Sequence, residues 1–258
     1  MRTMTINIQN LIEQRPYLKD PFEFYARWQS FQRKADAIMP RNRTTLLPAE
    51  SKSYPRDSAG SVLWSFVAVF NLSREGLAPL GQALEAGEID FMRLPLDELP
   101  SLSPPLPEGE LATILFLLSK PWFLRLRETC VLDGRPWEDG RCPVCSARPA
   151  LTSIAEGPQR RLHCSWCGTT GPYRFIGCPN CGTEDPAKFG TLVPEGEPGF
   201  RVATCDGCRT YVKVVEGQIF NAMTPDLADL ASLPLDIVAQ GKDYARRAPN
   251  PIGLKRIP

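Results

Sequence analysis

The sequence has only one histidine, His163, and no H-x-E motif around it. The zinc deaminases place their ligand histidine and their catalytic glutamate in that motif, so this class is excluded. Glycine-rich loops that bind phosphate are absent as well. No pair of acidic or basic side chains stands out as a general acid and base. The sequence therefore contains few of the catalytic motifs that most enzymes use.

Long apolar runs are also missing. The best run, residues 111–118, is far shorter than the ~20 apolar residues that a membrane-spanning helix needs. Residues 1–10 lack the apolar stretch and cleavage site of a signal peptide. We therefore expect a cytoplasmic protein without membrane insertion. In that compartment cysteines are kept reduced, which favours metal binding over disulfide bonds.

The chain has almost no net charge, because its 30 basic residues nearly equal its 29 acidic residues in number. Residues 141–216 carry nine basic and seven acidic side chains. Two divalent ions, each held by four thiolates, would make this region mildly negative. Since DNA-binding proteins gain most of their affinity by neutralising phosphates, a nucleic-acid-binding zinc ribbon is the least favoured interpretation.

The cysteines, in contrast, are arranged in a regular pattern. Eight of its nine cysteines form four C-x-x-C pairs. This spacing lets two thiolates converge on one tetrahedral ion, and two pairs complete a site. The pairs are Cys142 with Cys145, Cys164 with Cys167, Cys178 with Cys181, and Cys205 with Cys208. The pattern is typical of two ribbon-like metal modules that follow one another.

Sequential pairing predicts a first site from Cys142, Cys145, Cys164 and Cys167, and a second from Cys178, Cys181, Cys205 and Cys208. Interleaved pairing is the alternative, but it would close longer loops. All-sulfur tetrahedral sites accept either zinc or iron, so the metal stays open. Catalytic zinc keeps an open coordination position. Four cysteines fill both predicted sites, so we expect no catalytic residues.

The predicted fold is α+β: an N-terminal helical domain, two rubredoxin- or zinc-ribbon-like four-cysteine modules, and a C-terminal helix. The predicted domains are residues 1–139, 140–175, 176–220 and 221–258. Helices are expected over residues 21–38, with Asp20 as N-cap, and over 58–71, 74–86, 108–119, 121–132 and 225–247, the last interrupted at Pro234. A surface loop is expected over 40–55. Strands are expected over residues 151–155, 160–163, 173–176, 200–204 and 211–216.

Several single residues allow a second interpretation. His163 precedes Cys164 and is expected to pack or form hydrogen bonds beside it rather than to act as a fifth ligand. Cys130 is expected to be a core residue, although a nucleophilic pair with His163 stays open. The aromatic residues near the cysteines could stack on bases, but without a basic surround we expect them to pack against the metal sites; these are Trp166, Tyr173 and Phe175.

The residues around the cysteines resemble the FdhE family of formate dehydrogenase accessory proteins. The resemblance covers roughly residues 120–258. It rests on Cys142-Pro-Val-Cys145, Leu162-His163-Cys164-Ser165-x-Cys167, Cys178-x-x-Cys181-Gly182, Cys205-Asp206-x-Cys208-x-x-Tyr211-x-Lys213, Asp226-Leu-Ala-x-Leu230-Ala and Pro249-Asn250-Pro251.

This resemblance implies a non-enzymatic assembly factor that binds two iron or zinc ions and the formate dehydrogenase catalytic subunit during maturation. The sequence departs from the family after Cys167, where Gly168 to Tyr173 replaces an acidic residue and tryptophan, and at Ala203, where a glutamate is expected. Because of these departures, the identity of the client, the protein that this chain would help to assemble, is not determined by the resemblance. The alternative function is a redox-active, rubredoxin-like iron protein that delivers electrons to the immature enzyme.

Overall fold

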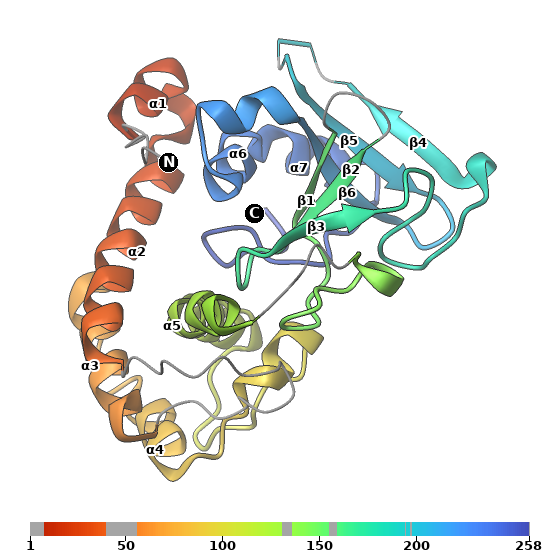
Figure 1. Cartoon of the computed structure of the whole chain (residues 1–258). Coiled ribbons are helices and arrows are strands. Elements are labelled where there is room, and N and C mark those ends of the chain that lie inside the picture. The colour runs from red at the N-terminus through yellow and green to blue at the C-terminus, as the bar shows by residue number, and fades with distance from the viewer. Residues whose placement is uncertain are drawn as a thin grey trace.

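A computed structural model describes residues 8–39, 56–130, 136–154, 159–193, 195–196 and 198–257. The loop predicted over 40–55 lies outside these residues. Figure 1 shows helices α1 to α5 on one side of the molecule and a six-stranded sheet with α6 and α7 on the other. The helices are α1 Ile8–Gln14, α2 Lys19–Ile38, α3 Arg56–Phe70, α4 Ala78–Ala86, α5 Glu108–Thr129, α6 Pro225–Ala231 and α7 Leu233–Gln240.

Helix α2 buries the apolar face that its sequence spacing predicts. Its buried side chains recur every three or four residues and are Phe22, Tyr25, Trp28, Phe31 and Ala35. The predicted N-cap is wrong, because the helix begins at Lys19 and its cap position is Leu18, without a side-chain hydrogen bond. A 3-10 turn over Pro16–Leu18 leads directly into the helix. Asp20 instead lies in the first turn, where its charge suits the helix dipole.

Helix α5 corrects a second prediction, because it is continuous through Pro121 where two helices were expected. Proline has no N–H, so Pro121 leaves the carbonyl of Leu117, four residues earlier, without its helical donor. The indole Nε1 of Trp28 in α2 donates to that carbonyl at 3.0 Å. A tertiary contact thus satisfies the group that proline frees, and the helix runs on.

We expect Trp28→Phe to lower the free energy of unfolding by about 1–2 kcal/mol, because it leaves a buried carbonyl without a donor. Pro121→Ala restores an N–H to that carbonyl, so Trp28→Phe should cost less in a Pro121→Ala background. Urea unfolding of the two single variants and the double variant measures this coupling. Equal costs in both backgrounds would contradict the proposed role of Trp28.

The remaining helices differ from their predictions mainly at the ends. Helix α4 begins at Ala78 rather than residue 74, because a turn precedes it in which Gly76 N–H donates to Ser73 Oγ at 3.3 Å. It ends at Ala86, and its C-cap residue Gly87 has a left-handed φ of 72°. The C-terminal helical region ends at Gln240 and not at residue 247.

The six strands form one sheet in the order β3-β2-β1-β6-β5-β4. All neighbours are antiparallel except β1 and β6, which are parallel. The strands are β1 Leu151–Ile154, β2 Arg160–His163, β3 Thr170–Tyr173, β4 Phe189–Leu192, β5 Phe200–Cys205 and β6 Thr210–Glu216. The strand predicted over 173–176 is wrong: β3 lies earlier, where Thr170 pairs with His163. Strand β4 was not predicted.

The two cysteine-rich halves, residues 140–175 and 176–220, are joined through this sheet. Strands β1, β2 and β3 belong to the first half and β4, β5 and β6 to the second, and the β1–β6 pair connects them. Helices α6 and α7 cover one face, where Val202 and Tyr211 meet Leu235 in a shared core. A larger core runs from the N-terminal helices into the first half. The predicted domain boundaries stay predictions.

Candidate metal centres

Four similar turns present the cysteines. In each, the residue after the second cysteine has a positive φ; these residues are Ser146 at 62°, Gly168 at 67°, Gly182 at 79° and Arg209 at 52°. In three of them, that residue's N–H donates to the carbonyl of the first cysteine at 2.8–3.0 Å, as from Gly168 to Cys164. Glycine adopts this conformation without strain, so Gly168 and Gly182 favour the turn already in the sequence.

The first centre brings together the thiols of Cys142, Cys145, Cys164 and Cys167, all of them buried. Its sulfur–sulfur distances are 3.4 Å from Cys142 to Cys167, 3.5 Å from Cys145 to Cys164 and 3.7 Å from Cys145 to Cys167. A tetrahedral zinc ion with Zn–S bonds of about 2.3 Å requires sulfurs about 3.8 Å apart. The four thiols therefore suit a metal ion and need only a small expansion.

The second centre brings together the thiols of Cys178, Cys181, Cys205 and Cys208. Cys178 and Cys208 are 3.7 Å apart and Cys181 and Cys205 3.8 Å apart, measured between sulfurs. The structure thus groups the cysteines sequentially, as the spacing predicted. It does not group them in the interleaved arrangement. Each group could hold one metal ion, iron or zinc; the role of each cysteine as a ligand stays a prediction.

Hydroxyl groups lie against both centres at equivalent positions. Thr169 Oγ1 lies 3.0 Å from the sulfur of Cys167, and Thr210 Oγ1 lies 3.0 Å from that of Cys208. Hydroxyl donors of this kind stabilise thiolates. Burial raises the pKa of the Cys145 and Cys164 thiols well above the ordinary value. Because metal ligation needs thiolates, ion binding at the first centre must release protons.

His163 is held by two hydrogen bonds and lies outside both groups of four cysteines. Its Nε2 lies 2.7 Å from Ser153 Oγ and its Nδ1 lies 3.0 Å from Thr170 Oγ1, so both ring nitrogens have partners. Burial lowers the pKa of His163 to about 3, which keeps the ring uncharged. The predicted packing role is confirmed. Cys130 donates to the carbonyl of Leu126 at 3.2 Å and takes no part in these hydrogen bonds.

The three aromatic residues near the cysteines have different surroundings. Trp166 is buried and packs edge-on against Phe116 and Phe123 of α5, with ring centroids 4.9 and 5.3 Å apart. Tyr173 is buried, and its hydroxyl donates to the carbonyl of Cys178 at 3.2 Å. The prediction is wrong for Phe175, which is 52% exposed.

A cluster of buried charged side chains lies beside the second half, and the sequence did not predict it. It consists of Lys213, Asp229, Asp236 and Arg246, all buried. Asp236 accepts from Lys213 Nζ at 2.7 Å and from Arg246 Nη1 at 2.9 Å, and Arg246 also bonds Asp229 at 2.9 Å. Burial alone would raise the pKa of Asp229, but the charges of Arg246 and Lys213 outweigh it and lower that pKa. Two positive and two negative charges balance one another.

One signal in the sequence points to this cluster. Asp229 and Asp236 interrupt an apolar stretch, and the structure buries both of them, Asp229 in α6 and Asp236 in α7. The Tyr-x-Lys motif supplies the partners, since Tyr211 donates to Asp236 at 2.5 Å. The motif that carried part of the family resemblance thus has a structural role.

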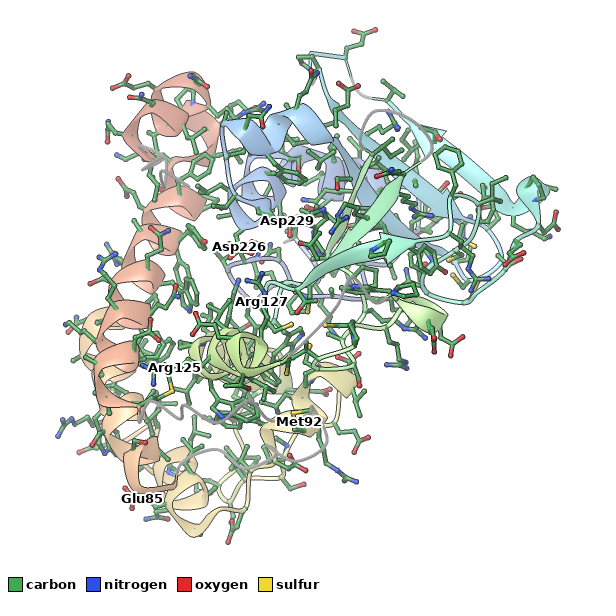
Figure 2. The ribbon with its side chains drawn as sticks, in the orientation of Figure 1. Glu85, Met92, Arg125, Arg127, Asp226 and Asp229 are labelled. Atoms are coloured by element: carbon green, nitrogen blue, oxygen red, sulfur yellow. The ribbon has the colours of Figure 1, made fainter. Side chains whose placement is uncertain are left out.

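A second buried lysine ties the helical region to α6. Lys120 of α5 is 1% exposed and lies 2.7 Å from the carboxylate of Asp226, measured from Nζ to Oδ2. The hydroxyl of Tyr25 in α2 donates to the same oxygen at 3.0 Å. Figure 2 shows Asp226 in the region between α2 and α6. Three helices far apart in the sequence meet at this carboxylate.

The two centres differ in their access to solvent. The cysteines of the first are all buried, whereas Cys181 of the second is exposed and Cys208 is half-buried. In the described part of the chain, no helix has the length and apolar character needed to cross a membrane.

We expect this difference to set the order of metal loss. Protein loaded with zinc should release one ion per chain quickly to the chelator 4-(2-pyridylazo)resorcinol and the other much more slowly, because the chelator reaches Cys181 directly. Cys181→Ser should remove the fast phase and leave the slow one. Release of both ions in one phase would contradict this expectation.

Two four-sulfur centres on one sheet, packed on a helical region, define a class of dual-centre metal-binding proteins. Residues 176–252 match the family model described as "FdhE, C-terminal domain". The chain is 27% identical over 144 residues to "Protein FdhE homolog" of Aquifex aeolicus, covering 54% of this chain and 51% of that protein. It is 31% identical over 113 residues to "Protein FdhE" of Escherichia coli, covering 43% of this chain and 36% of that protein.

A crystal structure of the FdhE protein from Pseudomonas aeruginosa has the same fold. Its TM-score to this chain is 0.67 at 21% sequence identity, with 95% of this chain and 92% of that chain covered. The predicted fold class is therefore confirmed, and the predicted resemblance to the FdhE family is confirmed by the match of residues 176–252 and by the similarity to these curated relatives. The sequence alignments to the curated relatives span about half of one relative and about a third of the other.

Proposed function

We propose that this protein is a cytoplasmic accessory factor, not an enzyme, that binds the formate dehydrogenase catalytic subunit during its maturation. Its similarity to FdhE proteins supports this function. The chemistry of the two centres supports it as well, because each offers four sulfur donors. An ion held by four thiolates has no open position for water or substrate, so neither centre suits hydrolytic catalysis.

The complete sulfur sets are the observation that carries the proposal. They suit ions that stabilise a surface rather than ions that react. Metal ligation supplies roughly 10–16 kcal/mol per structural zinc site in model peptides. The strands that connect the cysteines are short, from four to seven residues. The metal ions would therefore hold the loops of both halves in place for a partner.

The test is affinity capture from a native lysate of the source organism under anaerobic, reducing conditions. We expect mass spectrometry to recover the formate dehydrogenase catalytic subunit with the metal-loaded protein. Protein stripped of metal and kept reduced is the control, and it should capture less of that subunit. Failure of the metal-loaded protein to capture any dehydrogenase subunit would overturn the proposal.

A rubredoxin-like electron carrier is the second candidate. The exposure of Cys181 favours it, because an iron ion at the second centre would lie close to the surface. Protein purified anaerobically should then contain iron and show ferric–thiolate absorption that dithionite bleaches. Colourless protein that contains only zinc would exclude this function and leave the accessory role intact.

A further inference from the structure

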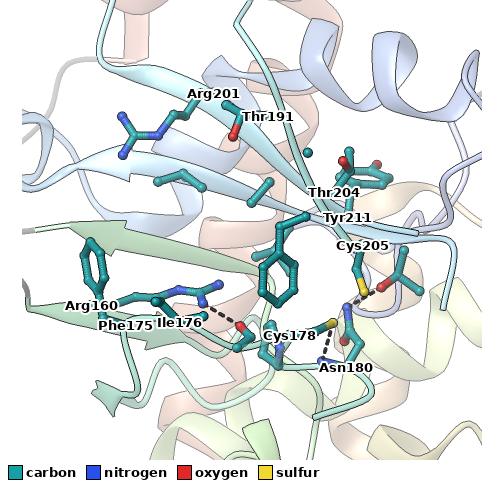
Figure 3. A pocket seen from close by; sticks show the side chains of 18 of the residues that line it. Arg160, Phe175, Ile176, Cys178, Asn180, Thr191, Arg201, Thr204, Cys205 and Tyr211 are labelled. Atoms are coloured by element: carbon teal, nitrogen blue, oxygen red, sulfur yellow. Dashed lines mark hydrogen bonds between the residues drawn. The ribbon is translucent and has the colours of Figure 1, made fainter. Parts of the chain in front are cut away.

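A pocket of about 260 Å³ opens on the sheet beside the second centre (Figure 3). Side chains alternate between the two faces of a strand. In β5, Val202 lies in the core under α7, whereas Arg201 and Ala203 line the pocket. The pocket therefore occupies the face that α6 and α7 leave uncovered. Apolar side chains line much of it; they are Ile154, Phe175, Ile176, Phe189, Ala203, Val212 and Val214.

Two large apolar side chains stand open to solvent at this pocket. Phe175 is 52% exposed and Ile176 is 53% exposed, and both belong to the loop between β3 and Cys178. Adjacent exposed apolar groups that join an apolar pocket are a common mark of an interaction site. Their positions beside the pocket indicate that a ligand would bury them.

The charged residues of the pocket are both arginines. Arg160 donates to two neutral oxygens, to Gly177 O at 2.8 Å and to Thr152 Oγ1 at 3.2 Å. Among the described residues, no carboxylate forms an ion pair with Arg160 or Arg201, and no acidic residue lines the pocket. The pocket thus combines apolar walls with two arginines and no carboxylate, and the negative charge of a metal-loaded second centre would come only from Cys178 and Cys205.

Both arginines lie toward the same end of the pocket, and the sulfurs of Cys178 and Cys205 lie toward the other (Figure 3). The strand register agrees. Arg201 is opposite Val214, near the end of β6, whereas Cys205 is opposite Thr210 at its start. Arg160 pairs with Ile154 at the end of β1. A ligand that lies along the pocket would therefore meet its cations at one end only.

The pocket borders β4, the edge strand of the sheet that the described residues form. Strand β4 is the last of the sheet, and its Thr191 lines the pocket. Lys188 O accepts from Asp206 N–H at 2.8 Å. Because alternate residues of an antiparallel strand bond to its neighbour, Gly190 and Leu192 face β5 and the N–H and C=O of Thr191 point outward. An extended peptide could bond to Thr191 and continue the sheet.

We propose that this pocket binds an extended segment of a client polypeptide, with an apolar side chain in contact with Phe175 and an acidic side chain paired with Arg201 and Arg160. The proposal rests on the proposed accessory function for the source of the peptide. A peptide fits better than a free anion, because it supplies an apolar group and backbone groups for the edge as well as a carboxylate.

The test uses full-length, metal-loaded protein and overlapping 12-residue peptides that cover the formate dehydrogenase catalytic subunit. Fluorescence anisotropy measures the Kd of each labelled peptide. We expect the binding peptides to carry Asp or Glu close to a large apolar residue, and Arg201→Gln to weaken them about tenfold. Arg161→Gln is the matched control, because Arg161 is exposed and belongs to the opposite face of β2. It should leave the Kd unchanged.

A second variant, and binding measurements with the intact catalytic subunit, distinguish failure of the pocket proposal from failure of the accessory function. Phe175→Ser removes an exposed side chain and should weaken the same peptides without unfolding the protein. If the intact subunit binds but Arg201→Gln and Phe175→Ser bind it as tightly as the wild type, the pocket proposal is overturned and the accessory function stands. If no intact subunit binds yet acidic peptides bind in an Arg201-dependent way, the pocket proposal stands and the accessory function fails.

Two other results would also overturn the pocket proposal. One is the absence of any peptide that binds the wild type. The other is a monomer–dimer equilibrium, seen by sedimentation, that Arg201→Gln shifts, since the occupant would then be a second copy of the chain.

Discussion

Replacing Cys164 by serine is expected to unfold the first cysteine-rich half and to lower the metal content from two ions per chain to one. Cys164 is buried within 3.5 Å of the sulfur of Cys145, so the loss of its thiolate opens the centre from inside. A structural zinc site contributes roughly 10–16 kcal/mol in model peptides, which is comparable to the whole stability of a domain.

The damage should extend beyond the metal loops. Trp166, between Cys164 and Cys167, packs on Phe116 and Phe123 of helix α5, so the first centre shares its core with the helical region. Metal analysis, circular dichroism and thermal unfolding of the variant would show this effect. Cys130→Ser is the control, because it removes a thiol outside both centres and should keep both ions. A Cys164→Ser variant with two bound ions and normal unfolding would contradict the assignment of the first centre.

Asp236→Asn is expected to lower the free energy of unfolding by about 3–5 kcal/mol, because the two buried cations Lys213 and Arg246 then share a single carboxylate, that of Asp229. Asp236 accepts from Lys213, Arg246 and Tyr211, and all three of these are buried. Asparagine has nearly the same shape, so the loss reports charge rather than packing. Urea unfolding of the metal-loaded protein measures it.

The exposed pair of Asp97 and Lys255 provides the comparison. Asp97→Asn also removes one carboxylate from an ion pair, but solvent can replace the lost interaction, so we expect a change below about 1 kcal/mol. Similar losses for Asp97→Asn and Asp236→Asn would mean that burial of the charge cluster is not what makes it important.

The sequence predicted the local features of this protein well. Each cysteine turn depends on a few consecutive residues, and the spacing of Phe22, Tyr25 and Trp28 follows directly from the helical period. The grouping of the cysteines followed from loop lengths alone. These features depend on neighbours in the sequence, which is why the pattern reveals them.

Features that depend on distant partners were missed or predicted wrongly. Pro121 predicts a helix break until Trp28 supplies the missing hydrogen bond from another helix. Asp229 and Arg246 look like surface residues until the fold brings them together in the interior. Strand β4 is only four residues long and contains Gly190, so it became visible only through its pairing with β5.

The unequal exposure of the two centres has a practical consequence for studying this protein. A chelator that empties the exposed centre would allow cobalt to be placed there while zinc stays at the buried one. The ligand-field absorption of cobalt depends on the geometry of its sulfur ligands, and Cys178 and Cys205 also line the pocket. The cobalt ion would then serve as a spectroscopic probe beside the pocket, and its absorption would change when a partner binds.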